Sequence, residues 1–94
     1  MYAAIRQMKV KTGTADELAQ RIKDAIPIIS GVEGFMGYYV IYAPDDTVTT
    51  IFSRVEEAEE SNRRALAWID ENVGPLLVGA ATATAGPVIV HSLP

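Results

Sequence analysis

Two polar side chains occupy positions where this sequence otherwise places apolar ones. Residues 2–10 alternate in the manner of a β-strand, and Arg6 shares one face with Ala4, Met8 and Val10. A helix turns by ~100° per residue. On the expected second helix this places Asn62 near the middle of an apolar stripe, which consists of Ala58, Ala65, Leu66, Ile69 and Val73. A buried guanidinium or amide requires hydrogen-bond partners. Both groups can also stabilise an anionic oxygen, such as that of an enolate or phenolate, so Arg6 and Asn62 are the candidate catalytic residues.

Each of these two residues also has a purely structural interpretation. Arg6 could extend its charged end to solvent, or it could pair with a carboxylate on a helix. Asn62 could bond a backbone group or a buried water instead of a ligand. The sequence leaves these alternatives open.

The tyrosines of residues 35–42 are the first candidates for substrate binding. Alternation along a strand groups Tyr38 with Tyr42 on one face and Tyr39 with Phe35 on the other. One of these sets should face the helices, where Tyr38 or Tyr39 could hydrogen-bond a phenolic substrate. Aromatic strand residues are nevertheless more often part of a core or an interface.

Trp68 and His91 complete the set of candidate substrate-binding residues. Trp68 lies about 100° from the middle of the apolar stripe of its helix, where it could equally form the rim of a core or a dimer contact. His91 lies near the end of the last expected strand. A lone histidine in that position is more often a surface or dimer-contact residue than a general base.

The spacing of apolar residues, together with the residues that typically begin and end helices and turns, predicts two helices and four strands. Thr14 and Glu17 match the capping-box pattern at the start of a helix, and Pro27 should end or kink that helix. Gly74 and Pro75 should end the second helix, whose acidic first turn complements the helix dipole; its carboxylates are Glu56, Glu57, Glu59 and Glu60. The expected strands cover residues 2–10, 35–42, 47–55 and 82–91, with a turn at residues 43–46 that has Pro44 in its second position.

The order β-α-β-β-α-β predicts a ferredoxin-like α+β fold, in which two helices cover one face of a four-stranded antiparallel sheet. The length of 94 residues suits a single domain over residues 1–94. The opposite face of the sheet would carry Ile51, Val55 and one alternating set from residues 35–42, and 49% of all residues are hydrophobic. A second copy of the chain is the simplest cover for such a face, so we expect a homodimer.

Composition excludes several classes of function. The chain has 8 basic and 12 acidic residues, for a net charge of −4, which argues against nucleic acid as a partner. It has no cysteine and one histidine, so disulfides and thiolate or multi-histidine metal sites are excluded, and we expect no metal or bound cofactor. No apolar run approaches the ~20 residues of a membrane span, and the N-terminus lacks a secretory pattern. We therefore expect a cytoplasmic protein with no membrane insertion.

Over nearly its whole length the chain resembles the antibiotic-biosynthesis-monooxygenase-like family of dimeric α/β barrel proteins. The resemblance rests on the order of elements and on the segments VKTGTADEL, VEGFMGYYVIYAPDD and EEAEESNRRA. It implies a homodimer whose two sheets face each other, with a pocket in each subunit between the sheet and its helices. It also implies that Arg6 and Asn62 point toward this pocket.

The same resemblance separates two kinds of chemistry. The family includes cofactor-independent oxygenases of polyketide-type aromatic substrates, and it also includes haem-degrading enzymes. The haem-degrading members carry an asparagine near the position of Arg6, and a tryptophan and a histidine in the second-helix region. This chain has Ser61 and Asn62 near the place of that tryptophan and no histidine in the helix, so the resemblance argues against haem degradation.

Two functions remain in close competition at this point. The first is a cofactor-independent, monooxygenase-like enzyme acting on a small apolar or aromatic molecule, which the family resemblance favours. The second is a non-catalytic, small-molecule-binding or regulatory homodimer of the same fold, which the scarcity of titratable residues in the expected pocket favours. A purely structural interaction module is a third alternative.

Overall fold

The computed structural model describes residues 1–55 and 59–94, and in residues 59–61 only the backbone. The strands are β1 (Tyr2–Lys9), β2 (Phe35–Tyr42), β3 (Thr47–Arg54) and β4 (Thr82–Pro87), and the helices are α1 (Ala15–Ser30), α2 (Glu59–Val73) and the short 3₁₀ turn η1 (Gly74–Leu76). Three residues of the expected second helix, Glu56, Glu57 and Ala58, lie outside the described part. Within the described part, no helix is long and apolar enough to cross a membrane.

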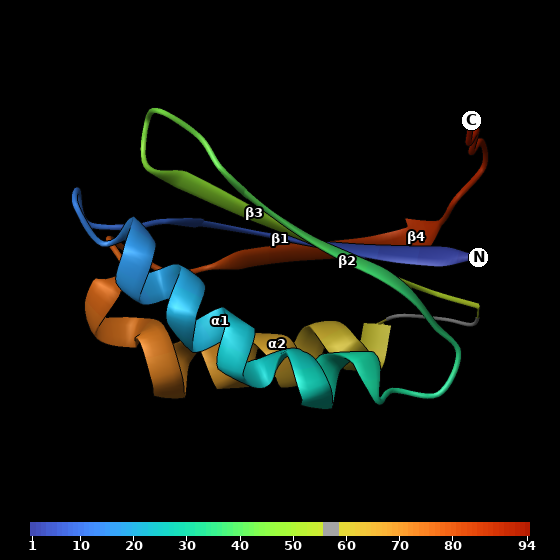
Figure 1. Ribbon diagram of the computed structural model, residues 1–94, viewed down its shortest axis with the longest axis horizontal. Coiled ribbons are helices and arrows are strands. Elements are labelled where there is room, and N and C mark those ends of the chain that lie inside the picture. The colour runs from blue at the N-terminus through green and yellow to red at the C-terminus, as the bar shows by residue number, and fades with distance from the viewer. Residues whose placement is uncertain (56–58) are drawn as a thin grey trace.

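The four strands form one antiparallel sheet in the order β2-β3-β1-β4. Both helices pack on the same face of this sheet, and none of the described residues forms a helix on its other face (Figure 1). Helix α1 packs mainly on β2, and α2 packs on β1 and β4. This arrangement confirms the predicted ferredoxin-like α+β fold.

The connection between β2 and β3 is the turn that the sequence predicted. The Asp46 amide donates to the Ala43 carbonyl at 3.0 Å and the Ala43 amide donates to the Thr47 carbonyl at 2.9 Å, with Pro44 in the second position of the turn. Asp46 has a φ of 64°, in the left-handed region that aspartate tolerates better than most residues. Its carboxylate accepts hydrogen bonds from the Thr12 and Tyr42 hydroxyls, each at 2.7 Å.

Helix α1 departs from the sequence prediction at its N-terminal end. The expected capping box does not form, because the Thr14 hydroxyl donates to the Lys11 carbonyl at 2.7 Å and Glu17 accepts a hydrogen bond from Arg21. Pro27 does not end the helix, which continues to Ser30. Proline lacks the backbone N–H that would donate a hydrogen bond to the carbonyl four residues earlier. The helix nevertheless buries Leu18, Ile22 and Ala25, which precede Pro27 and pack on the sheet.

Strand β2 contains a β-bulge that changes which residues share a face. Its pairing with β3 shifts register between Phe35 and Gly37, so two residues of β2 oppose one residue of β3. Phe35 consequently packs against Phe52 on the helix side, with ring centroids 5.8 Å apart. The prediction that Phe35 shares a face with Tyr39 was wrong, because simple alternation does not include the extra residue of a bulge.

The C-terminal strand is shorter than expected. Strand β4 ends at Pro87 rather than at residue 91, although the Val88 amide still donates to the Met1 carbonyl at 2.9 Å. The residues beyond it leave the sheet on the side away from the helices (Figure 1). His91 lies in this exposed segment and not on a strand.

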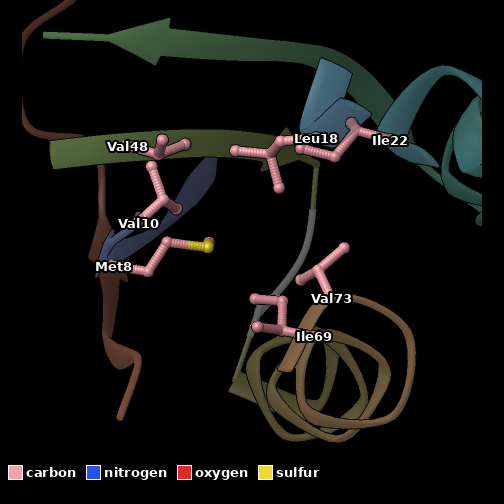
Figure 2. Close-up of a cluster of buried hydrophobic side chains, with 7 residues drawn as sticks. All are labelled: Met8, Val10, Leu18, Ile22, Val48, Ile69 and Val73. Atoms are coloured by element: carbon pink, nitrogen blue, oxygen red, sulfur yellow. The ribbon is translucent and has the colours of Figure 1, made fainter. Parts of the chain in front are cut away.

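The core of the molecule consists of two separate apolar clusters. Figure 2 shows the larger cluster, in which side chains from β1, β3, α1 and α2 point toward one another; it comprises Met8, Val10, Leu18, Ile22, Val48, Ile69 and Val73. The smaller cluster is built on Ala4 and Phe52, with Phe35 among the half-buried residues packed on it. Along β1 and β3 the two clusters are separated by one residue on the helix side of each strand, Arg6 and Thr50.

Asp46, in the turn between β2 and β3, is expected to make the stability of the protein depend on pH in acid. Hydrogen bonds from Thr12 and Tyr42 lower the pKa of Asp46 below its ordinary value of 3.8. A group whose pKa is depressed by folding stabilises the protein above its unfolded pKa, and this contribution is lost as the pH falls through the folded value. We expect the midpoint of urea unfolding to decrease as the pH is lowered from 5 to about 2. Asp46→Asn should make this decrease smaller, and asparagine tolerates the same left-handed backbone conformation as aspartate.

The control for this measurement is Asp70→Asn, which removes an exposed carboxylate of α2 outside the turn. It should retain the acid dependence of the wild-type protein. An equal acid dependence in the wild type and Asp46→Asn would contradict the assignment.

Candidate functional site

A cavity of about 220 Å³ lies between the sheet and the two helices. Its walls are apolar and come from α1, through Leu18 and Ile22, and from α2, through Trp68 and Ile69. Residues of both core clusters contribute to its lining. The cavity therefore occupies the gap between the clusters, where the sheet presents polar side chains.

The floor of the cavity is a row of three polar residues on three adjacent strands. Arg6 of β1 and Thr50 of β3 are direct cross-strand partners. Tyr38 of β2 pairs with Phe52, so its side chain lies diagonally from Thr50 on the same face of the sheet. All three line the cavity, and we call them the polar row.

Arg6 is the central charged group of the site. Only 4% of its surface is exposed, and its Nε donates a hydrogen bond of 2.8 Å to Asn62 Oδ1 on α2. Its guanidinium carbon lies 5.3 Å from the centroid of the Phe52 ring, within the range of a cation–π interaction. Burial lowers the pKa of Arg6, an effect that nearby Tyr38 partly opposes. Arginine titrates so far above neutrality that the group stays charged.

Asn62 finds its hydrogen-bond partner in a side chain rather than in the backbone. Its carbonyl oxygen accepts from Arg6 across the space between α2 and β1. Arg6 and Asn62 thus come together as the sequence analysis expected, although 56 residues separate them. Arg6 lines the cavity itself, whereas Asn62 acts on it through Arg6.

Tyr38 presents a neutral hydroxyl to the cavity at neutral pH. Burial raises the pKa of Tyr38, and this outweighs the lowering caused by the Thr50 hydroxyl and by the charge of Arg6. A phenol that keeps its proton can donate a hydrogen bond to a ligand oxygen. The structure therefore places one of the two candidate tyrosines at the cavity.

Sequence reasoning missed two polar residues that line the cavity, the exposed Arg64 and the buried Thr50. Thr50 is 2% exposed, and its hydroxyl makes no hydrogen bond of acceptable geometry to any described residue. The neighbouring Tyr38 hydroxyl is close enough to be influenced by it but not aligned for a hydrogen bond. Thr50 alternates with Val48 and Phe52 along β3, so the reasoning applied to Asn62, a polar residue on an apolar face, would have found it.

The other predicted substrate-binding residues divide into two groups. Trp68 is half-buried, packs on the larger cluster and lines the cavity. Tyr39 lies on the opposite face of the sheet and is 68% exposed, and His91 is exposed beyond the last strand. Neither Tyr39 nor His91 lines this cavity.

The described lining of the cavity contains no histidine and no carboxylate. Nor do three histidine, aspartate or glutamate side chains gather anywhere in the described residues as a metal site would need. What the site offers is hydrogen-bond donors around one buried positive charge. Such a site can stabilise a negative charge that develops on a bound oxygen.

A family model matches about two thirds of the chain. The model for antibiotic biosynthesis monooxygenases matches residues 1–62, which run from β1 into α2 and include both Arg6 and Asn62. The chain belongs to this family. No curated protein matches it.

Solved structures of the same fold include proteins with different descriptions. One of them is a protein from Nitrosomonas europaea that is described as a putative antibiotic biosynthesis monooxygenase. It superimposes with a TM-score of 0.76 at 12% identity, and the match covers 96% of this chain and 100% of that one. A protein of unknown function from the same organism gives 0.74 at 17% identity, over 99% and 93% of the two chains. A variant of MhuD with two manganese protoporphyrin IX molecules bound per active site gives 0.75 at 15% identity, over 100% of both chains. At these identities the likeness shows the fold alone.

The hydrogen bond between Arg6 and Asn62 can be tested by a double-mutant cycle. Asn62→Leu removes the acceptor of a buried charged donor and should lower the free energy of unfolding by about 1–3 kcal/mol. In an Arg6→Met background the same substitution should cost less than about 0.5 kcal/mol, because the donor is already gone. Urea denaturation of the wild type, both single variants and the double variant measures the coupling. Additive effects would contradict the assigned contact.

Proposed function

We propose that this chain is a cofactor-independent, monooxygenase-like enzyme that acts on a small apolar or aromatic molecule bound between sheet and helices. The observation that carries the proposal is the buried Arg6, held by Asn62 at the polar floor of a cavity whose walls are mostly apolar. Membership in the antibiotic biosynthesis monooxygenase family supports it. In this proposal Arg6 is the catalytic residue, and Asn62 positions it.

The polar floor would act by making the substrate more acidic. A bound substrate with a weakly acidic carbon or hydroxyl loses a proton more readily when its anion lies beside a desolvated guanidinium. The electron-rich anion can pass an electron to dioxygen and then combine with the superoxide formed, which gives a hydroperoxide after protonation. Loss of water from a hydroperoxide at a former CH₂ group leaves a carbonyl, so one oxygen atom enters the product and the other leaves as water.

A second function is favoured because the described cavity lining lacks a group that could accept a proton from a substrate. The described lining has no carboxylate or histidine in position to act as a general base. A receptor needs only shape, apolar walls and a few placed donors, which this cavity supplies. A non-catalytic, small-molecule-binding or regulatory homodimer is therefore the alternative.

The relation to haem is part of the same proposal. The MhuD variant that shares the fold has two manganese protoporphyrin IX molecules bound per active site. This chain has Arg6 on the floor of its cavity and no histidine in α2. We propose that it does not degrade haem.

We also propose that residues 1–94 act as one domain of a cytoplasmic homodimer. The face of the sheet without helices carries exposed apolar side chains, among them Ile5, Tyr39 and Ile41. Ile51 lies in the same row as Ile5 and Tyr39, between them on the central strand β3. Apolar side chains that adjoin on one face are the kind of surface that a second copy would cover.

Oxygen consumption tests the enzymatic proposal. Dithranol, a tricyclic aromatic ketone with an acidic CH₂ group, should be oxidised faster with the protein than without it, with the carbonyl product formed at one equivalent per dioxygen. Arg6→Met should lower kcat at least tenfold, whereas Lys9→Met, which removes an exposed cation from the same strand, should leave it unchanged. Saturable binding of dithranol without oxygen uptake would favour the receptor, and haem turnover with release of iron would overturn the proposal.

Sedimentation equilibrium tests the dimer. At micromolar concentration the mass should be about twice the 10.2 kDa of the chain. Tyr39→Lys adds a charge to the uncovered face and should yield monomers, while Ile28→Lys, on the exposed surface of α1, should remain dimeric. A wild-type monomer at these concentrations would rule out this assembly.

A further inference from the structure

The exposed part of the cavity lining lies between the two helices. Among the described side chains that line the cavity, only Ile28 of α1 and Arg64 of α2 are exposed. The helices contact each other and run in opposite directions, so the C-terminal part of α1 and the N-terminal part of α2 lie at the same end of the sheet (Figure 1). Ile28 and Arg64 therefore mark the mouth of the cavity.

Arg64 is placed at this mouth by the helical repeat of α2. It lies one turn before Trp68 on the same side of the helix, and both side chains line the cavity. Trp68 is half-buried, Ile69 is buried and Arg64 is exposed. The wall that α2 contributes thus changes from apolar to charged toward the N-terminal end of the helix. The preceding residue, Arg63, is also exposed but does not line the cavity.

The charges that line the described part of the cavity are positive. Arg6 lies on the floor and Arg64 at the mouth, and the described lining contains no carboxylate. The whole chain, by contrast, has a net charge of −4. A cleft with charges of one sign and walls of low dielectric constant concentrates ligands of the opposite sign. The cavity is therefore suited to an anion that most of the protein surface would repel.

We propose that Arg64 is a specificity-determining residue that binds a carboxylate of the ligand at the mouth of the cavity. The ligand class is an apolar molecule that ends in a carboxylate. Its uncharged body enters between the apolar walls, which include Trp68 and Ile69, and its carboxylate stays at the mouth, where a planar guanidinium matches it in shape and charge. This inference rests on the proposed function and adds to it a second, anionic group on the bound molecule.

The different burial of the two arginines decides which of them takes the carboxylate. Arg6 is 4% exposed and donates to Asn62, so a carboxylate beside it would lose all of its hydration. A carboxylate at the exposed Arg64 keeps part of its water. Arg64 also interacts with other groups of the chain, but polar contacts of exposed side chains are weak and can be exchanged for a contact with a ligand.

Two matched ligands and two matched variants test the proposal. α-Naphthylacetate carries a carboxylate at about pH 7, whereas α-naphthylacetamide has nearly the same shape and no charge. Arg64→Gln removes the charge at the mouth, and Arg63→Gln removes the neighbouring exposed charge that does not line the cavity. Dissociation constants come from amide chemical shifts in NMR titrations, and thermal unfolding of each variant verifies that it is folded.

We expect the wild-type protein to bind α-naphthylacetate about tenfold more tightly than the amide. Arg63→Gln should retain this preference, whereas Arg64→Gln should bind the two ligands about equally. Sodium chloride at about 0.5 M should weaken binding of the carboxylate and leave binding of the amide unchanged, because salt screens an exposed charge far more than a buried one.

Two results would overturn the role of Arg64. A preference for the carboxylate that survives in Arg64→Gln would assign the anion to another group, such as the buried Arg6. An equal loss of preference in Arg63→Gln and Arg64→Gln would mean that the general field of the helix, and not a contact at the mouth, attracts the ligand.

The same titrations separate a failure of this inference from a failure of the proposed function. If the wild-type protein binds both ligands without preferring the carboxylate, only the role of Arg64 is wrong. If it binds neither ligand, the cavity is not a receptor for small aromatic molecules, and the proposed function and this inference both fail.

Discussion

The burial of one guanidinium is the constraint on which the rest of the structure depends. Arg6 lies in the middle of a central strand, under both helices, with 4% of its surface exposed. A charge in that position is stable only when its donors are satisfied and its surroundings are polarisable. The 2.8 Å hydrogen bond to Asn62 and the face of the Phe52 ring both contribute to meeting that requirement. The hydrogen bond to Asn62 also fixes how α2 lies against β1.

The same charge explains why the core is divided. Apolar side chains cannot close over the polar row without leaving its donors unpaired, so the two clusters end on either side of Arg6 and Thr50. The space left between them is the cavity. If the proposed function holds, folding and ligand binding make opposite demands on the same positions, because an apolar residue at position 6 or 50 would fill the core but remove the polar floor of the cavity.

The two faces of the sheet serve different purposes because its strands alternate strictly almost everywhere. On the helix side the alternation brings the polar row together, and on the other side it presents Ile5, Tyr39 and Ile41. The bulge near Met36 is the exception, and it turns Phe35 toward the smaller cluster. By adding Phe35 to the helix side, the bulge closes one end of the core beside the cavity.

The sequence by itself determined the order of the elements, the side of β1 on which Arg6 lies and the stripe of α2 that carries Asn62, because these follow from periods of two and 3.6 residues along the chain. The capping box predicted at Thr14 did not form, because Thr14 bonds the Lys11 carbonyl and Glu17 bonds Arg21, which are competing local contacts. Only the tertiary structure decided that Tyr38 and Trp68 reach the cavity while Tyr39 and His91 do not. It also decided that Thr50 stands beside Arg6, because strand register sets which residues adjoin and no period within a single strand encodes it.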